Sequence, residues 1–242
     1  MLKGIYNTAA SMVPRLRKQE VIANNLANAE TAGYKKDSLF LRVFKKEQGI
    51  SAKLIQPSWE VRMIDKIYTD YSGGALEATG CDLDLALQSD GFFAVLTPNG
   101  EAYTRNGAFT LGADGTLTSS DGYPVLGDGG PIVLTQDKVA VGNDGQLMVD
   151  GQTIGKLRIV DFEDPLQLQK TSGTLYTTDG ATTPITPANV NVRQGYLERS
   201  NVDILKEMVD MIDTYRMFET GQKMIQIQDD TLGKAVSELP RV

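Results

Sequence analysis

The amino-acid sequence predicts a mixed fold in which N- and C-terminal coiled-coil-like α-helices are brought together and bracket an all-β middle domain of hairpins. Apolar residues recur in a four-three alternation at both ends of the 242-residue chain, which is the period of helices that pack in pairs. Between the ends, short apolar runs alternate with glycine turns, a pattern typical of hairpins. We therefore expect a helical segment over 1–35, an extended connector over 36–74, an all-β domain over 75–194 and a helical segment over 195–242.

The N-terminal helix is predicted by an apolar stripe that only Gln19 interrupts. The stripe consists of Leu2, Ile5, Ala9, Met12, Leu16, Ala23 and Leu26. Pro14 predicts a break, because an interior proline costs about 3 kcal/mol; it either kinks the helix or begins a segment that runs to Ala29. The helix is expected to end around Ala29, with Gly33 as a left-handed terminator.

The connector and the middle of the chain are predicted to be extended. The sequence over 39–53 mixes apolar and charged residues without a clear period. The alternation of Val61, Met63, Ile67 and Tyr68 within 59–71 predicts a strand. Asp-Gly and Asn-Gly pairs then recur at short intervals from residue 90 to residue 151, which indicates hairpin turns. The sequence over 113–117 is echoed over 143–147, and we expect two similar hairpins there.

The C-terminal helix is predicted to begin after Ser200 or Asn201, either of which is a suitable N-cap, and to run to about Glu238. Asp203 and Glu207 would lie near its positive end. Its apolar stripe, with Gln222 and Asp229 as exceptions, consists of Ile204, Met208, Met211, Tyr215, Phe218, Ile225, Leu232 and Val236. Two long stripes need each other or a neighbouring chain, so the helices either close one monomeric core or join subunits.

Composition excludes several partners. Asp and Glu number 31 against 24 Lys and Arg, and the basic residues are scattered, so neither nucleic acid nor an anionic membrane is an expected partner. Cys81 is the only cysteine, and we expect a small buried apolar residue there, with a reactive thiol as the alternative. No apolar run suits a membrane span, and Asn7, Ser11 and Arg15 interrupt the region where a Sec-type signal needs its apolar block.

Enzyme chemistry is disfavoured because the chain has no histidine, which removes Ser-His-Asp and Cys-His nucleophile systems and the usual zinc sites. Carboxylate pairs remain, at Asp82 with Asp84 or at Asp161 with Glu163 and Asp164, but such acids more often cap turns. The glycine-rich stretch 127–130 lacks the Lys-Ser/Thr of a phosphate loop. We expect no catalytic, cofactor-binding or metal-binding residues, no cofactor and no small-molecule substrate.

Three blocks of sequence resemble the bacterial flagellar rod and hook family, and together they span nearly the whole chain. They are 22–28 with 31–35 (IANNLAN and TAGYK), 90–93 with 103–107 (DGFF and YTRNG), and 195–202 (GYLERSNV). Within the family, the compact length and the segments 127–132 and 216–219 are most similar to the proximal rod protein, whereas 80–87 and the Phe92-Phe93 pair suit the distal rod protein equally. Pro14 and the stretch 45–47 depart from the commoner family text, and the long middle insertions of hook proteins are absent.

The resemblance implies a structural axial subunit of the flagellar basal-body rod, exported by the flagellar type III apparatus without a cleaved Sec signal. Such a subunit polymerises with copies of itself and with other rod and hook proteins into the periplasm-spanning, torque-transmitting drive shaft. A non-polymerising accessory that caps or chaperones the axial structure is the second hypothesis. A glycan-cutting factor with Asp82 and Asp84 as its carboxylates is the third.

The expected assembly interface combines the two apolar stripes with the polar residues beside them. Asn24, Asn25 and Asn28 are poor helix formers, so their amides are expected to bridge to other chains or cap carbonyls, unless they only terminate the helix. The full set is Leu2, Ile5, Ala9, Met12, Leu16, Ala23, Asn24, Asn25, Leu26, Asn28, Gly33, Tyr34, Asn201, Val202, Leu205, Met208, Ile212, Tyr215, Phe218, Ile225 and Leu232.

Overall fold

The computed structural model describes residues 2–45, 60–134, 139–178, 180, 182–187 and 189–238. The chain forms two compact units, and each is described by itself below. The helical unit comprises Met1–Ala27, Asp37–Tyr68 and Asp203–Val242. The β unit comprises Asn28–Lys36 and Thr69–Val202. The chain therefore passes from one unit to the other after residues 27, 36, 68 and 202.

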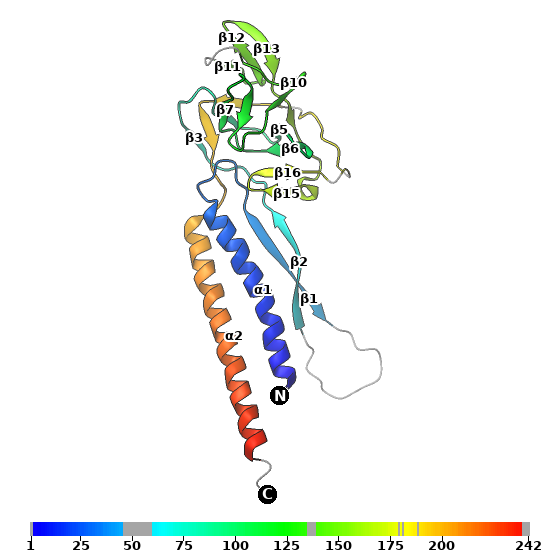
Figure 1. Ribbon diagram of the computed structural model, residues 1–242, viewed down its shortest axis with the longest axis vertical. Coiled ribbons are helices and arrows are strands. Elements are labelled where there is room, and N and C mark those ends of the chain that lie inside the picture. Colours follow the sequence, from blue (N-terminus) through cyan, green and yellow to red (C-terminus); the bar gives the residue numbers. More distant parts are fainter. Residues whose placement is uncertain are drawn as a thin grey trace. The chain divides into compact units, whose positions relative to one another are not determined.

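The helical unit consists of two long helices and one two-stranded sheet. Helix α1 (Leu2–Ala27) and helix α2 (Ile204–Glu238) lie side by side and run in opposite directions (Figure 1). Strand β1 (Asp37–Lys45) pairs with β2 (Glu60–Thr69), and β1 also contacts α1. The structure confirms the predicted strand β2 and the predicted end of α2 at Glu238. Strand β1 was not recognised from the mixed, charged sequence of 39–53. Residues 46–53 lie outside the described part of the chain.

Pro14 does not break α1, so the expected interruption is wrong. The helix is continuous from Leu2 to Ala27, with Pro14 inside it and buried. Proline removes one intrahelical hydrogen bond, but burying its ring recovers apolar contact that offsets part of this cost.

The N-cap of helix α2 lies two or three residues after the predicted one. The Asp203 carboxylate accepts a hydrogen bond from the Lys206 amide at 3.2 Å, so Asp203 is the N-cap in place of Ser200 or Asn201. Glu207 lies in the first turn, where its charge suits the positive helix end.

A five-stranded antiparallel sheet is the centre of the β unit. Its strand order is β14-β5-β6-β16-β15. The central hairpin pairs Phe93 with Thr104 and Thr97 with Gly100. The strands are β5 (Phe92–Thr97), β6 (Gly100–Thr104), β14 (Ile159–Val160), β15 (Gln169–Ser172) and β16 (Leu175–Thr177).

Smaller antiparallel sheets surround this centre. One has the order β11-β12-β13, and the others are the pairs β3–β18, β4–β17, β7–β8 and β9–β10. Their strands are β3 (Leu76–Ala78), β4 (Leu85–Leu87), β7 (Phe109–Leu111), β8 (Leu117–Ser119), β9 (Leu126–Gly127), β10 (Gly130–Pro131), β11 (Ala140–Val141), β12 (Gln146–Val149), β13 (Gln152–Lys156), β17 (Val192–Gln194) and β18 (Tyr196–Glu198). A short 3-10 helix, η1, spans Pro165–Gln167.

The two predicted similar hairpins have the same turn geometry. In 112–116 and in 142–146, the first glycine amide donates to the carbonyl four residues later at 2.8 Å, and the second glycine amide donates back at 2.9 Å. Asp114 and Asp144 each accept the amide two residues later at 3.2 Å. The sequence echo is thus confirmed as a repeated turn structure.

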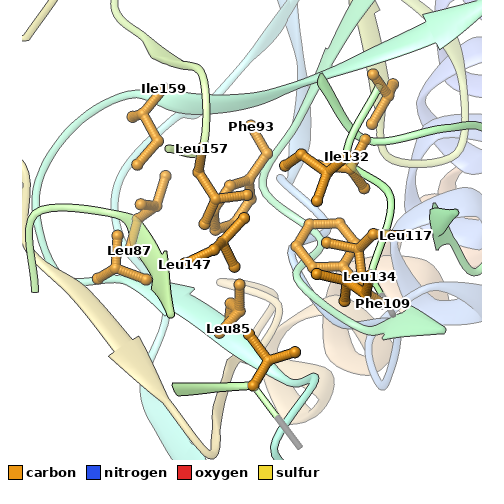
Figure 2. Close-up of a cluster of buried hydrophobic side chains, with 14 of the residues drawn as sticks. Leu85, Leu87, Phe93, Phe109, Leu117, Ile132, Leu134, Leu147, Leu157 and Ile159 are labelled. Atoms are coloured by element: carbon orange, nitrogen blue, oxygen red, sulfur yellow. The ribbon is translucent and has the colours of Figure 1, made fainter. Parts of the chain in front are cut away.

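The β unit contains two hydrophobic clusters, on opposite faces of strand β5. Phe93 and Val95 belong to the larger cluster, where the Phe93 and Phe109 rings meet edge to face at 5.2 Å (Figure 2). Phe92 and Ala94 belong to the second cluster, with Tyr176 and other aromatic residues. Because successive side chains of a strand point to opposite faces, β5 is covered on both sides.

Two further expectations are corrected by the β unit. Cys81 is exposed and not buried, because it lies in a turn at the surface of this unit. Gly33 has the expected left-handed conformation, with φ +68°, but it lies beyond the end of α1 and does not terminate it. A Cβ at Gly33 would lie 2.3 Å from the Asn106 backbone nitrogen, so the glycine permits a close backbone contact.

Candidate functional site

The α1-facing side of α2 carries buried small and polar residues beside half-buried apolar ones. Glu207, Thr214 and Gly221 are buried and recur every seven residues, which keeps them on one face of the helix. A Cβ at Gly221 would lie 3.2 Å from Cγ of Met12, so the two helices approach closely there. The Arg15 guanidinium donates to the Met217 carbonyl at 2.8 Å. We call this side of α2 the inner face.

The opposite side of α2 is a broad exposed apolar surface, which we call the outer face. Leu205 is 77% exposed, and Val209 is 59% exposed. Spacings of three and four residues place the whole group on one side of a helix. The outer face comprises Ile204, Leu205, Met208, Val209, Ile212 and Tyr215. Beyond it the same side carries the Glu219–Lys223 ion pair at 2.8 Å, followed by the exposed Ile227.

Helix α1 also has an outer face, and its apolar side chains are smaller. Ala9, Val13, Leu16 and Ala23 are exposed on it. Val13 and Leu16 are its largest members, at 57% and 43% exposure. The exposed Arg17 and Glu20 side chains form an ion pair at 2.8 Å beside them.

The predicted interface residues divide among three positions. Those exposed on the outer faces are Ala9, Leu16, Ala23, Leu205, Met208, Ile212 and Tyr215, with Asn24 exposed as well. Those half-buried in the helices are Met12, Leu26, Phe218, Ile225 and Leu232. Those in the connecting segments of the β unit are Asn28, Gly33, Tyr34, Asn201 and Val202. The side chains of Leu2 and Ile5 lie outside the described ones.

Asn25 is held inside its own chain. It is 1% exposed, and its amide makes two hydrogen bonds to the Asp37 backbone, one to the amide and one to the carbonyl, both 2.9 Å long. The same amide nitrogen donates to the buried Glu207 carboxylate at 3.3 Å. Asn25 therefore joins α1, α2 and the start of β1 and is not part of the exposed surface. The contact with the Asp37 carbonyl corresponds to the other expected role, in which the amide caps a carbonyl.

A buried ionic cluster lies in the β unit, and sequence analysis did not predict it. We call Lys35, Arg105 and Glu198 the junction cluster. The Lys35 ammonium lies 2.6 Å from one Glu198 carboxylate oxygen, and the Arg105 guanidinium lies 3.4 Å from the other. All three side chains are at least nine-tenths buried. Burial lowers the pKa of the Lys35 ammonium below its usual 10.5, although the pairing with Glu198 opposes this shift.

Backbone groups complete the junction cluster. Lys35 also donates to the Ser72 carbonyl at 2.7 Å, and the Gly74 amide donates to Glu198 at 2.8 Å. Arg105 donates to the Ser89 carbonyl at 3.0 Å. The Glu198 carboxylate therefore has partners from three separate segments of the chain, as a buried charge requires.

Further hydrogen bonds join the connecting segments around this cluster. The Asn201 side chain accepts from the Lys36 amide at 2.8 Å and donates to the Asp70 carbonyl at 2.9 Å. The Gly33 amide donates to the Glu198 carbonyl at 2.7 Å. On the other side, the Lys170 ammonium lies 3.8 Å from the centre of the buried Tyr34 ring.

Each member of the junction cluster occurs in one of the three sequence blocks singled out above. Lys35 ends the TAGYK block, Arg105 stands in YTRNG and Glu198 in GYLERSNV. The charged residue in each block was the one feature of the sequence that could have indicated a buried ionic cluster. Sequence alone does not show that blocks this far apart meet at one point.

Three of the carboxylates considered for catalysis accept hydrogen bonds from residues nearby in the chain. Asp84 accepts from the Thr79 hydroxyl at 2.6 Å, and Asp161 accepts from the Phe162 amide at 2.8 Å. Asp164 caps η1 by accepting from the Leu166 amide at 3.1 Å. Among the described residues, no group of acidic or cysteine side chains gathers closely enough to hold a metal ion. Neither helix, as far as it is described, combines the length and apolar content of a membrane crossing.

Three family models match successive parts of the chain. "Flagella basal body rod protein" matches residues 7–35, "Flagellar hook protein FlgE/F/G D1 domain" matches 86–149, and "Flagellar basal body rod FlgEFG protein C-terminal" matches 193–238. These regions contain the two outer faces and all three members of the junction cluster.

Curated relatives align over nearly the whole chain. The flagellar basal-body rod protein FlgF of Caulobacter vibrioides is 34% identical over 249 residues, which cover 100% of both chains. The flagellar basal-body rod protein FlgG of Bacillus subtilis is 33% identical over 264 residues, covering 98% of this chain and 99% of the relative. The flagellar hook-basal body complex protein FlhO of Bacillus subtilis is 30% identical over 271 residues, with 100% of both covered.

Proposed function

The chain belongs to the flagellar basal-body rod protein family, and we propose that it builds the rod by packing the outer faces of its terminal helices against neighbouring subunits. It is an axial structural subunit and not an enzyme. The observation that carries the proposal is the exposed apolar outer face of α2, where Leu205 is 77% exposed. Covering one such large side chain contributes about 1.5–3 kcal/mol.

The inner and outer faces have separate tasks in this proposal. Glu207, Thr214 and Gly221 are already used within the chain, so a neighbour can reach only the other side of α2. The two outer faces differ in size, because α2 presents large apolar side chains and α1 presents mostly small ones. Such unlike surfaces suit heterologous contacts, which repeat without closing and so build a helical tube.

The helical unit has little apolar core of its own. Among its described side chains, Pro14, Val21 and Ile22 are the buried aliphatic ones, whereas the β unit contains two clusters. Most of the stability of a helix comes from packing an apolar face. Assembly would therefore supply much of the stabilisation that the helices lack in the single chain.

We further propose that this is a proximal rod subunit, with the distal rod protein as the alternative. The family relatives include both FlgF and FlgG proteins. Two segments support the proximal assignment. The sequences of 127–132, in the β9–β10 hairpin, and of 216–219, on α2, are most similar to the proximal rod protein, as is the compact length of the chain. Complementation tests it: the chain should restore motility to cells that lack the proximal subunit, and rescue of distal-subunit mutants alone would reverse the assignment.

The same proposal extends to the location of the protein in the cell and to its partner proteins. The chain would be exported by the flagellar type III apparatus without a cleaved Sec signal and reside in the periplasm-spanning rod. Its partners would be copies of itself and other rod and hook proteins. Its stiffness, rather than any chemistry, would transmit motor torque.

Assembly is tested by placing a charge on the outer face of α2. Leu205→Asp or Ile212→Asp should leave the β unit folded but abolish incorporation into purified basal bodies, because burying an unpaired charge costs several kcal/mol. The matched control is Gln226→Asp, which adds the same charge at an exposed position beyond the apolar surface. The proposal fails if the Leu205 and Ile212 variants assemble and swim as well as the control.

A further inference from the structure

We propose that the junction cluster is a mechanical clamp, in which Glu198 and Lys35 are positioning residues that fix the connecting segments so that torque passes through them without local opening. The inference rests on the proposed function, because a clamp matters only in a subunit that carries load. It assigns a role to buried charges that the assembly surface does not use.

The position of the cluster along the chain is the first argument. Lys35 stands just before the crossing at residue 36, and Ser72 follows the crossing at 68 within a few residues. Glu198 stands shortly before the crossing at 202. Any force carried along the chain between the units must pass these covalent crossings. Along the sequence, a cluster member or its partner stands within four residues of three of the four crossings.

The division of partners around Glu198 is the second argument. One carboxylate oxygen accepts from Lys35 and from the Gly74 amide, at 2.6 and 2.8 Å. The other faces Arg105 at 3.4 Å, and Arg105 is anchored to the Ser89 carbonyl. The Glu198 side chain thus joins the segment of Lys35, the segment of Gly74 and strand-end residue Arg105 of the β unit. Removing its charge weakens all three contacts together.

The chemistry of the cluster is the third argument. Buried ion pairs add little net stability compared with well-packed apolar residues, because desolvating the charges offsets their attraction. They are directional, however, since each hydrogen bond fixes both a distance and an angle. A cluster that holds several segments in one geometry is therefore better explained by positioning than by stability.

Two pockets lie next to the junction cluster. A cavity of about 240 Å³ is lined by Gly73, Gly74, Asp90, Arg105 and Glu198. A second, of about 260 Å³, is lined by Glu30, Glu77, Glu198 and other residues. Glu198 lines both pockets, and its polar contacts with Lys35, Gly74 and Arg105 hold it in place there.

The test compares Glu198→Gln, which removes the charge and keeps the shape, with Glu101→Gln. The control breaks an exposed ion pair to Arg158 in the same unit. Hydrogen exchange on the purified chain should quicken about tenfold or more at the Gly33, Lys36 and Gly74 amides in Glu198→Gln, while the amides of strand β5 keep their protection. Glu101→Gln should leave both regions unchanged.

Motility under load provides the readout that a purely stabilising role would not change. Basal bodies should contain Glu198→Gln at wild-type amounts, but swimming speed should fall more steeply with medium viscosity than in the wild type or the control. If Glu198→Gln does not fold, Arg105→Lys takes its place, because it keeps the charge and shortens the reach to Ser89.

The outcomes separate the clamp from the proposed function. Exchange that rises uniformly across the β unit, or not at all, overturns the clamp. Local opening with wild-type load dependence also overturns it. Absence of the wild-type chain from purified basal bodies refutes the rod function instead, and the exchange experiment still reports whether Glu198 holds the segments.

Discussion

At the scale of single residues, a missing Cβ decides where two backbone segments of the β unit meet. Gly107 follows Asn106, a pair that normally indicates a turn with a left-handed glycine. Its φ is not positive, however, and a Cβ there would lie 1.6 Å from the Leu85 carbonyl oxygen. The Leu85 amide also donates to the Gly107 carbonyl at 3.0 Å. The glycine is therefore required by close approach rather than by turn conformation.

Gly107→Ala should lower the free energy of unfolding by about 1–3 kcal/mol, because the methyl group must displace the Leu85 backbone. Gly155→Ala is the control, since a Cβ at Gly155 meets no atom within 4 Å and its φ is not positive. Urea unfolding measures both. Equal midpoints for the two variants would contradict the close contact.

Lys35 predicts a pH dependence whose sign follows from its lowered pKa. Between the lowered folded-state pKa and the usual 10.5, the unfolded chain binds more protons than the folded chain. The Lys35 contribution to the free energy of unfolding should therefore rise as the pH rises through this window, and fall as the pH is lowered. The difference between wild type and Lys35→Met, measured by urea unfolding at several alkaline pH values, should show this rise. A difference that falls with pH would mean that pairing with Glu198 outweighs burial.

At the scale of elements, α2 packs against α1 with one face and exposes apolar side chains on the other, because the two faces differ in composition. Its inner face is small and polar enough for α1 to approach closely, with Gly221 beside Met12. Its outer face carries the large apolar side chains. The predicted apolar stripe divides between the two faces. Met211, Phe218 and Ile225 are half-buried on the side toward α1, whereas Met208 and Tyr215 are exposed.

Gly221→Leu should separate α1 from α2, because its Cβ alone would lie 3.2 Å from the Met12 side chain. We expect a loss of about 1–3 kcal/mol in the stability of the helix pair. Gly233→Leu provides the control, since a Cβ there meets nothing within 4 Å and leucine favours a helix by up to about 1 kcal/mol. Thermal melts followed by far-ultraviolet circular dichroism measure both variants. Equal melting of the two would show that the close approach at Gly221 is unimportant.

At the scale of the whole molecule, the apolar core is concentrated in one unit. The β unit contains both hydrophobic clusters, whereas the helical unit buries few aliphatic side chains among those described. The units should therefore differ in local stability before assembly.

Hydrogen exchange and limited proteolysis on the purified monomer should find α1 and α2 less protected than the strands of the central sheet. Assembled rods should show both helices fully protected, because neighbours then cover the outer faces. Helices as protected as the sheet in a monodisperse monomer would favour a self-contained binding module and count against assembly-coupled ordering.

Sequence patterns alone were enough to predict the helices at both ends, the hairpins between them, strand β2 and the family. These features depend on local periodicity and turn residues, such as the alternation through Val61 and Met63 or the repeated Asp114 and Asp144 turns. Such patterns act within a few residues and can be read without knowing what packs against them.

Which face of each helix is exposed, and which charges are buried, depends on contacts between segments that are distant in the sequence. Asn25 and Glu207 meet across 182 positions, and Lys35 and Glu198 across 163, so no local pattern marks them as partners. Pro14 lies buried inside α1, and the Asn201 side chain is held by Lys36 and Asp70, which leaves Asp203 to cap α2. Burial and pairing are set by segments distant in sequence, which is why the junction cluster appeared only in three dimensions.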